Sequence, residues 1–326
     1  MKPISDKQLK PWISFEEQLQ RLQARGMQVT RRDKALDYLE RVGYYRLSGY
    51  WYPMRQIDRA ASATTGREVR QDTFIPGSCF EDVVRLYVFD KKLRLLALDA
   101  LERIEMAVRV DVAHRLGKRH PCAHERPEFL HGNFSKRLIN KGVDAGKTGH
   151  QVWLGKYRAL LARSRKEPFV VHHMERYDGA LPVWVAIEVW DFGLLSHLFA
   201  GMKYEDQQVI AAQYGAKDGQ TFAKWLRSLN FIRNVSAHHS RLWNVNMLEW
   251  SPAMQGWPDK LNPGRMFFYF SLMRHLLGVI CPNSTWGERV KALLREEFPA
   301  SGNGAWSLAD FGVFEQWEAW PLWASR

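Results

Sequence analysis

Apolar residues recur at helical spacing along most of this chain. The strongest pattern runs from Phe80 to about Leu116, where valine, leucine and isoleucine return every three or four positions among charged residues. Oppositely charged residues stand one helical turn apart in the pairs Asp99/Arg103 and Glu105/Arg109. This segment therefore predicts one long helix that carries ion pairs along its surface.

Shorter segments with the same periodicity predict further helices. Ser14 is a suitable N-cap for the first of them, and Glu17 completes a capping box three residues later. We expect the long helix to stop at Gly117 and Pro121, and Pro182 to lie in the first turn of an apolar helix. The shorter predicted helices cover residues 14–25, 31–42, 151–166, 182–202, 205–214, 221–241 and 265–280.

The segments between these helices carry turn-forming or aromatic residues. Residues 43–53 are dense in aromatic side chains. Residues 58–78 predict an exposed loop, and residues 117–150 predict a loop with short helical pieces. No segment shows the alternation that is typical of strands. We therefore predict an all-α protein in three parts. These are an N-terminal helical and aromatic segment (1–78), a helical bundle (79–282) and a tryptophan-rich tail (283–326).

Composition narrows the class of protein. The 326 residues carry 47 Lys and Arg against 35 Asp and Glu, a formal net charge of +12, and 46% are hydrophobic, which excludes a largely disordered chain. No run approaches ~18 uncharged apolar residues, and residues 1–12 lack the apolar core of a secretory signal. Three scattered cysteines predict a reduced, cytoplasmic protein without a disulfide framework. The excess of positive charge favours nucleic acid as partner.

The segment Ser228–Asn244 carries the most informative group of polar residues. An apolar helix leads into Arg233, Asn234, His238 and His239, and Asn234 and His238 stand one turn apart. A histidine can move protons near neutral pH, an amide can orient its ring, and an arginine can bind a phosphate with its planar fork. Cleavage of RNA through its ribose 2′-hydroxyl needs little else, so these residues are candidates for catalysis.

A purely structural interpretation of the same residues is that cationic side chains are favourable at the C-terminus of a helix. The spacing Arg-x4-His is weak evidence by itself, because it occurs four more times in the chain. Those four pairs are Arg109/His114, Arg115/His120, Arg119/His124 and Arg126/His131. The pair at 233 and 238 differs because asparagine follows the arginine, a second histidine follows the first, and an apolar helix precedes both.

Five motifs together resemble a known family. Arg-Asn-x3-His is the signature of the HEPN superfamily of α-helical ribonucleases. It follows, in order, GYYRLSGY at 43–50, LYVFDKKLR at 86–94, LERIE at 101–105 and LPVW at 181–184. Over residues 10–280 the chain resembles the Abi family of bacterial abortive-infection proteins, of the AbiD/AbiF-like kind.

The resemblance implies a HEPN-like bundle with an N-terminal helical extension and a role in phage defence or as a toxin. It implies metal-independent RNA cleavage by a homodimer, and association with a small structured RNA. Arg233 and His238 would form the catalytic pair, Asn234 would orient them, and His239 would be a neighbour without an assigned role. No cofactor or metal is expected.

Several other residues are weaker candidates. Tyr44, Tyr45 and Arg46 could contact RNA bases, although packing against the bundle is the favoured interpretation. Glu105 and Arg109 form either a structural ion pair or a support for Arg233. A basic run offers contacts for the RNA backbone or a solvated helix face; it consists of Arg158, Arg163, Arg165 and Lys166. The histidines around Cys122 lack paired zinc spacing.

Two other functions stay open at this point. The chain could hold a small structured RNA without cutting it, using the same fold. It could instead be a protein-interaction component of a defence system, with the tryptophan-rich tail as its docking surface.

Overall fold

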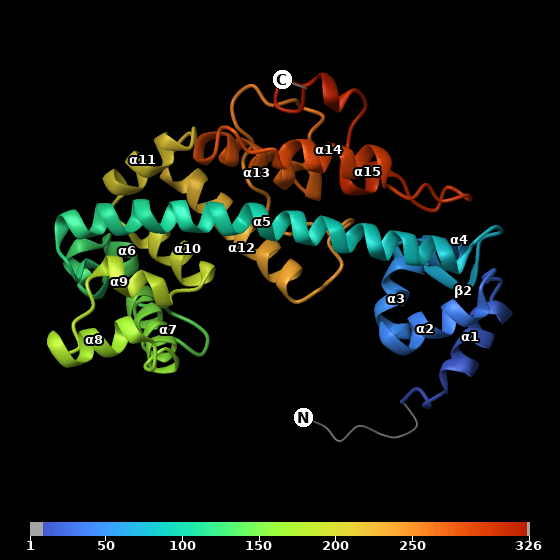
Figure 1. Ribbon diagram of the computed structural model, residues 1–326, viewed down its shortest axis with the longest axis horizontal. Coiled ribbons are helices and arrows are strands. Elements are labelled where there is room, and N and C mark those ends of the chain that lie inside the picture. The colour runs from blue at the N-terminus through green and yellow to red at the C-terminus, as the bar shows by residue number, and fades with distance from the viewer. Residues whose placement is uncertain (1–8, 325–326) are drawn as a thin grey trace. The chain divides into compact units, whose positions relative to one another are not determined.

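The computed structural model describes residues 9–324 (Figure 1). Within them the chain forms fifteen α-helices and a single two-stranded sheet, which confirms the predicted all-α class. Most of the N-terminal segment in which no secretory signal was found lies outside the described residues, as do the last two residues of the tail. Of the helices described, none combines the length and apolar character needed to cross a membrane.

The described residues divide into two compact units. The first takes in the residues up to Leu93 together with 292–310, and the second takes in 94–291 and 311–324. Helix α5 (Phe80–Arg119) and helix α14 (Trp286–Glu296) each contribute to both units. The predicted division at residues 78 and 282 stays a prediction.

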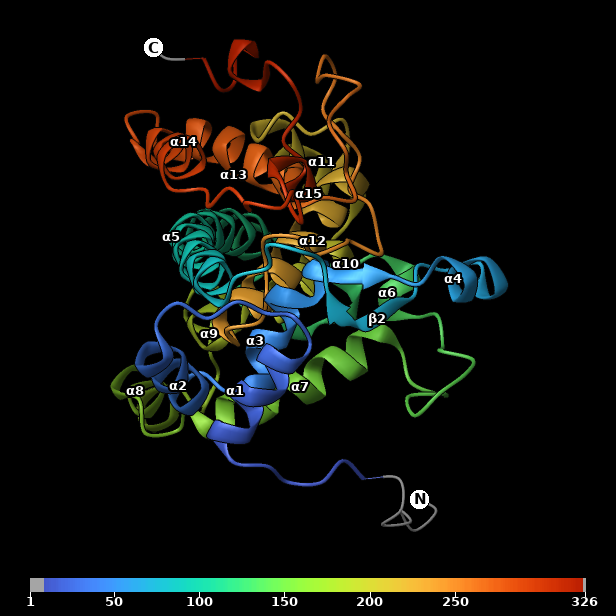
Figure 2. The same ribbon diagram turned by 90° about the vertical axis from the view of Figure 1, so that its right-hand side faces the viewer.

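The first unit combines short helices with the small sheet. Its helices before α5 are α1 (Phe15–Ala24), α2 (Arg32–Arg41), α3 (Tyr44–Trp51) and α4 (Arg59–Thr65). Strands β1 (Arg55–Ile57) and β2 (Arg70–Phe74) pair antiparallel, and α4 follows β1 (Figure 2). Ser14 and Glu17 cap α1 reciprocally, as the sequence predicts.

The predicted loop at 58–78 is wrong. Asp58 accepts a hydrogen bond from Ala61 N at 2.9 Å, which starts α4, and Gly66 ends this helix in the left-handed conformation. Strand β2 then pairs with β1, a pairing that the sequence of β2 does not predict. The alanine, serine and threonine content suggested a loop, but a good N-cap and a partner strand decide the structure here.

Helices make up most of the second unit. Besides most of α5, its helices before the tail are α6 (Gly132–Ser135), α7 (Gly149–Arg163), α8 (Pro168–Arg176), α9 (Val183–Ala186), α10 (Phe192–Gly201), α11 (Tyr204–Gln213), α12 (Gly219–Ala237) and α13 (Met266–Ile280). Helix α5 passes between α13 on one side and α7 on the other in both views. The predicted helices in this unit agree with these bounds to within a few residues, except around Gly117 and Pro182.

The two exceptions have local causes. Gly117 does not stop α5, which continues to Arg119. The glycine serves packing instead, since a Cβ there would lie 3.2 Å from the ring of Trp184. Pro182 precedes the short α9 rather than a helix to residue 202. The chain is extended at Trp190, and Asp191 caps the new helix α10 by accepting from Leu194 N at 2.7 Å.

The tryptophan-rich tail is packed into the two units. Of its five tryptophans, Trp286, Trp306, Trp317 and Trp323 are buried. Trp323 donates to the Ser271 hydroxyl of α13 at 2.9 Å, and its ring stacks on Phe267. These side chains therefore build the core, and the idea of a tryptophan docking surface is wrong for the four that are buried.

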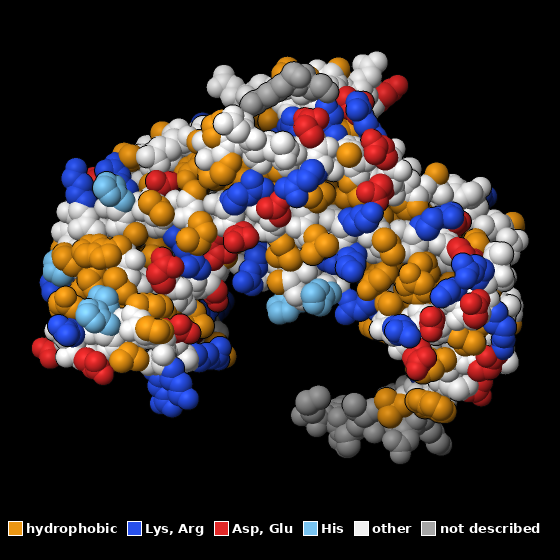
Figure 3. All heavy atoms as spheres, in the orientation of Figure 1, with side chains coloured by type: hydrophobic (Ala, Val, Ile, Leu, Met, Phe, Trp, Pro, Cys, Tyr) orange, Lys and Arg blue, Asp and Glu red, His pale blue; other side chains and the backbone are white. Residues whose placement is uncertain are grey.

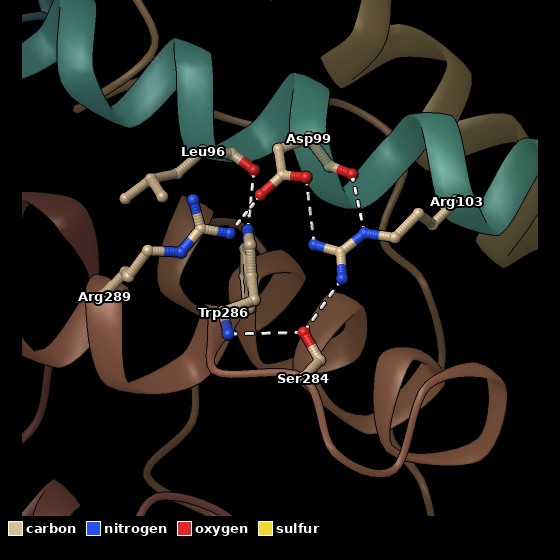
Figure 4. A network of polar contacts seen from close by, with 6 residues as sticks. All are labelled: Leu96, Asp99, Arg103, Ser284, Trp286 and Arg289. Carbon is tan, nitrogen blue, oxygen red and sulfur yellow. Dashed lines mark hydrogen bonds and ion pairs between the residues drawn. The ribbon is translucent and has the colours of Figure 1, made fainter.

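A polar network fastens α14 to α5 (Figure 4). The Trp286 indole donates to Leu96 O at 2.7 Å, and Arg103 donates to the Ser284 hydroxyl at 2.9 Å. Asp99 accepts from Arg103 at 3.0 Å and also pairs with Arg289. The predicted pair Asp99/Arg103 is thus confirmed, and its carboxylate additionally binds the tail.

Candidate catalytic site at the end of helix α12

Helix α12 is held firmly up to its last turn. Asp218 caps its start by accepting from Thr221 N at 2.7 Å. The side chains of Phe222, Leu229 and Ile232 are fully buried, and the helix packs against α10 and α11. This packing fixes the position of the polar residues that follow Ile232 on the other side of the helix.

Arg233 and Asn234 lie side by side on the last turns of α12. Both are half-buried, and Arg233 Nη1 lies 3.4 Å from the amide oxygen of Asn234, a long hydrogen bond. The sequence predicts that the amide orients the imidazole of His238. In the structure it contacts the guanidinium instead, so it restricts the arginine fork.

His238 ends the helix, and its side chain is exposed. His239 follows in the left-handed conformation, with φ at 57°. Its N–H donates to Ser236 O at 3.1 Å, and Ser240 N–H donates to Val235 O at 2.9 Å. These two bonds form a Schellman motif, which satisfies carbonyls at the helix end. The motif places Arg233, Asn234 and His238 together at one exposed helix terminus.

The left-handed conformation of His239 predicts an unusual order of stability. A residue with a Cβ pays about 1–2 kcal/mol in this conformation, whereas glycine does not. We therefore expect His239→Gly to be more stable to urea than His239→Ala by about 1 kcal/mol. At Ala237, the last residue of α12, glycine should instead cost up to about 1 kcal/mol, because the backbone there is right-handed helix. Equal stability of the two His239 variants would contradict the assignment.

Two buried polar atoms, one within this motif and one a few residues after it in the sequence, lack hydrogen-bond partners among the described residues. Ser236 is 1% exposed, and its hydroxyl has no hydrogen-bond partner among the described residues; the buried amide oxygen of Asn244 has none there either. Buried polar groups are ordinarily satisfied. The Ser236 hydroxyl lies between Arg233 and His238 in the sequence, so this unpaired group belongs to the same end of α12 as the candidate site.

Arg94 is a residue of this region that the sequence analysis did not single out. It lies on α5, is 4% exposed, and its Nη1 lies 3.4 Å from Ser240 O, just past the Schellman motif. The guanidinium thus contacts the chain where it leaves α12. The motif at 86–94 contains this arginine. Its contact with Ser240 could not be predicted, because 146 residues separate the two in the sequence.

The pair Glu105/Arg109 is a nearly buried ion pair. Arg109 Nη2 lies 2.7 Å from Glu105 Oε1 and 2.5 Å from Trp190 O, and each side chain of the pair is 13% exposed. Arg109 therefore holds the chain just before α10. At the start of that helix, a Cβ on Gly193 would lie 3.6 Å from the amide of Asn230, so α10 and α12 approach closely here. The structural interpretation is confirmed; support for Arg233 stays a prediction.

Arg109 also lines an apolar groove of about 450 Å³. Met106 and Val110 of α5 and Trp184 of α9 form its exposed hydrophobic walls. Hydrophobic side chains gather over this part of the surface, toward the left of Figure 3. On the same face, both signs of charge are mixed rather than separated, so the excess of positive charge does not form one continuous patch there.

The predicted RNA-backbone contacts are all accessible. Thr148 and Gln151 form a capping box that starts α7, and the basic run lies at the end of this helix and just beyond it. The four exposed side chains are Arg158, Arg163, Arg165 and Lys166. Exposure suits either a solvated helix face or a nucleic-acid contact, so their role stays a prediction.

The predicted aromatic contacts belong to the first unit, whereas Arg233 and His238 belong to the second. The Tyr44 ring packs edge-on against Trp51 with a centroid distance of 4.9 Å, while Tyr45 is 92% exposed and Arg46 is exposed. Packing therefore accounts for Tyr44. Tyr45 and Arg46 are accessible, and their contact with RNA stays a prediction.

The histidines around Cys122 serve separate structural purposes. His120 Nδ1 accepts from Cys122 N at 2.9 Å, His124 is fully buried, and His131 caps α6. Throughout residues 9–324, no three His, Cys, Asp or Glu side chains are grouped so that they could hold a metal ion.

The fold and the site together define a class: an almost wholly helical protein with arginine, asparagine and histidine at one exposed helix end. The chain belongs to the family described as Abi-like protein, whose sequence model matches residues 37–244. This match ends at Asn244 and includes the whole site on α12. Comparison with curated proteins and with solved structures gave no match.

Proposed function

We propose that this protein is a metal-independent HEPN endoribonuclease that acts in bacterial defence against phage. One observation carries the proposal: α12 ends with a half-buried arginine, an asparagine that contacts it and an exposed histidine. Membership of the Abi-like family supports the role in abortive infection. RNA cleavage of this kind belongs in the cytoplasm, where its substrates are.

His238 takes the proton from a ribose 2′-hydroxyl in this proposal. The 2′-oxygen then attacks the adjacent phosphorus, the bond from phosphorus to the 5′-oxygen breaks, and that oxygen receives a proton. The products are a 2′,3′-cyclic phosphate and a 5′-hydroxyl. Arg233 stabilises the charge that builds up on the phosphorane, and its contact with Asn234 keeps the guanidinium in place.

A second copy of the chain completes the site. The reaction uses both a base and an acid, and the segment 233–238 supplies one histidine with an arginine. The family resemblance supports a homodimer in which two such segments meet. His239, next to His238, is held by the Schellman motif and acts through the shape of the helix end.

Digestion of RNA in excess EDTA tests this proposal. We expect cleavage to persist without divalent metal, and the products to end in 2′,3′-cyclic phosphate and 5′-hydroxyl groups. Specific activity should fall on dilution as the dimer dissociates. Cleavage that EDTA abolishes would contradict the mechanism, and constant specific activity across dilution would contradict the shared site.

A non-catalytic RNA-binding module is the second candidate. The exposed side chains of Tyr45 and Arg46 favour it, because an accessible aromatic ring next to a cation can stack on an unpaired base. Under this alternative the purified protein should carry a small structured RNA and leave it intact. Sequencing of the RNA that copurifies with the protein, compared with the digestion above, separates the two candidates.

A further inference from the structure

The exposed face of α12 continues well beyond the site. Arg227, Phe231, Asn234 and His238 follow one another at intervals of four, three and four residues, which places them along one side of the helix. Phe231 is 43% exposed, and the Arg227 side chain is 54% exposed. The distance along the axis from Arg227 to His238 is ~16 Å. The exposed aromatic ring of Phe231 thus lies between the Arg227 guanidinium and the proposed catalytic histidine, His238.

Two neighbouring helices bring a lysine and a histidine close to Arg227. The Trp153 indole of α7 donates to Leu194 O of α10 at 2.9 Å, which sets these helices side by side. The close approach of Gly193 to Asn230 sets α10 against α12. Lys156, His197 and Arg227 each lie about one turn from these contacts, on α7, α10 and α12.

The electrostatics of His197 agree with this arrangement. Part of its side chain is accessible, yet desolvation of the remainder, together with the positive charges of Lys156 and Arg227, lowers its pKa. Asp191 acts in the opposite direction on His197. Glu249 lies 3.5 Å from Arg227, but its side chain is 78% exposed, so solvent screens this pair. Lys156 and Arg227 therefore place two positive charges here that exposed carboxylates balance only weakly, while His197 is favoured in its neutral form, which can still donate a hydrogen bond.

We propose that Lys156 and Arg227 bind the phosphate backbone of single-stranded RNA, that the His197 imidazole donates a hydrogen bond to it, and that Phe231 stacks on a base between these residues and His238. This inference rests on the proposed function, since it assigns the path by which the substrate reaches Arg233 and His238. Unpaired RNA is recognised by positively charged side chains combined with aromatic rings, and side chains of both kinds are present along this face.

Binding of a non-cleavable RNA tests the inference separately from catalysis. The probe is a fluorescein-labelled 12-nucleotide RNA of mixed sequence, 2′-O-methylated throughout so that no 2′-hydroxyl can attack. Fluorescence anisotropy is measured over a range of salt concentrations. We expect Phe231→Ala to weaken binding by about 5- to 100-fold with little change in salt dependence, and Phe231→Trp to retain binding.

The cationic residues should change the salt dependence instead. Arg227→Gln and Lys156→Gln should each reduce the slope of log affinity against log salt by about 0.7, the value for one phosphate contact in single-stranded RNA. Lys260→Gln and Trp184→Ala are matched controls, since both side chains are exposed in the same unit. Both controls should bind like the wild type, and circular dichroism checks that every variant is folded.

Three results would overturn the inference. One is a wild-type protein that does not bind the oligonucleotide. Another is wild-type affinity and slope in the variants of Phe231, Arg227 and Lys156; if the wild type still cleaves RNA, only this inference fails. The third is conversion of a dimer into a monomer by Phe231→Ala in sedimentation experiments, with an unchanged salt slope, which would assign the face to a second copy of the chain.

Discussion

Replacement of His238 by alanine should reduce the rate of RNA cleavage by about 10²- to 10⁴-fold, because this is the usual contribution of a positioned acid or base. The side chain is exposed at the end of α12, so the substitution removes no buried contact and should leave the fold unchanged. Single-turnover cleavage of an end-labelled RNA measures the effect. Binding of the 2′-O-methylated probe should remain close to that of the wild type.

The chain offers a close control for this experiment. His172 and His173 on α8 form a second pair of adjacent histidines in the same unit, and His172 is exposed like His238. His172→Ala should therefore cleave at the wild-type rate. If His238→Ala cleaves as fast as His172→Ala, His238 is not the catalytic residue, and any cleavage comes from another site or from a contaminant.

Replacement of Arg109 by methionine should lower the free energy of unfolding by about 3–5 kcal/mol, since it leaves Glu105 nearly buried without its partner. It also removes the hydrogen bond to Trp190 O that holds the chain before α10. Urea denaturation followed by circular dichroism measures the loss. The additional substitution Glu105→Gln should recover part of it, because the unpaired charge is then gone.

An exposed ion pair in the same unit provides the comparison. Lys147 lies 3.1 Å from Asp144, and the lysine side chain is 56% exposed. Lys147→Met should therefore cost at most about 1 kcal/mol. A comparable loss in the Arg109 and Lys147 variants would show that the pair on α5 is no more important than a surface pair.

The sequence predicts the helices well where packing follows a regular period. Helices α5 and α12 each bury an apolar stripe, so the spacing of their leucines and isoleucines is sufficient to locate them. It fails where a partner distant in sequence decides the structure. Strand β2 depends on β1, and the break before α10 depends on Arg109 of α5 and on the cap at Asp191.

The candidate site divides in the same way. Arg233, Asn234 and His238 lie within two turns of one helix, so a local motif can identify them. Arg94, Lys156 and His197 come from three other helices, and no spacing in the sequence connects them with α12. The outward position of Phe231 could have been inferred from its place one turn after Arg227, because these residues share the exposed stripe.

The burial of the tail also has a consequence for synthesis on the ribosome. Trp317 and Trp323 both pack against Phe267 of α13, in the interior of the second unit. A nascent chain that has emerged only as far as residue 310 already contains Arg233 and His238, but it lacks the tryptophans that cover α13. Folding of this unit therefore has to wait until the residues after 310 have emerged. Under the proposed function, Arg233 and His238 are therefore synthesised before the unit that carries them can finish folding.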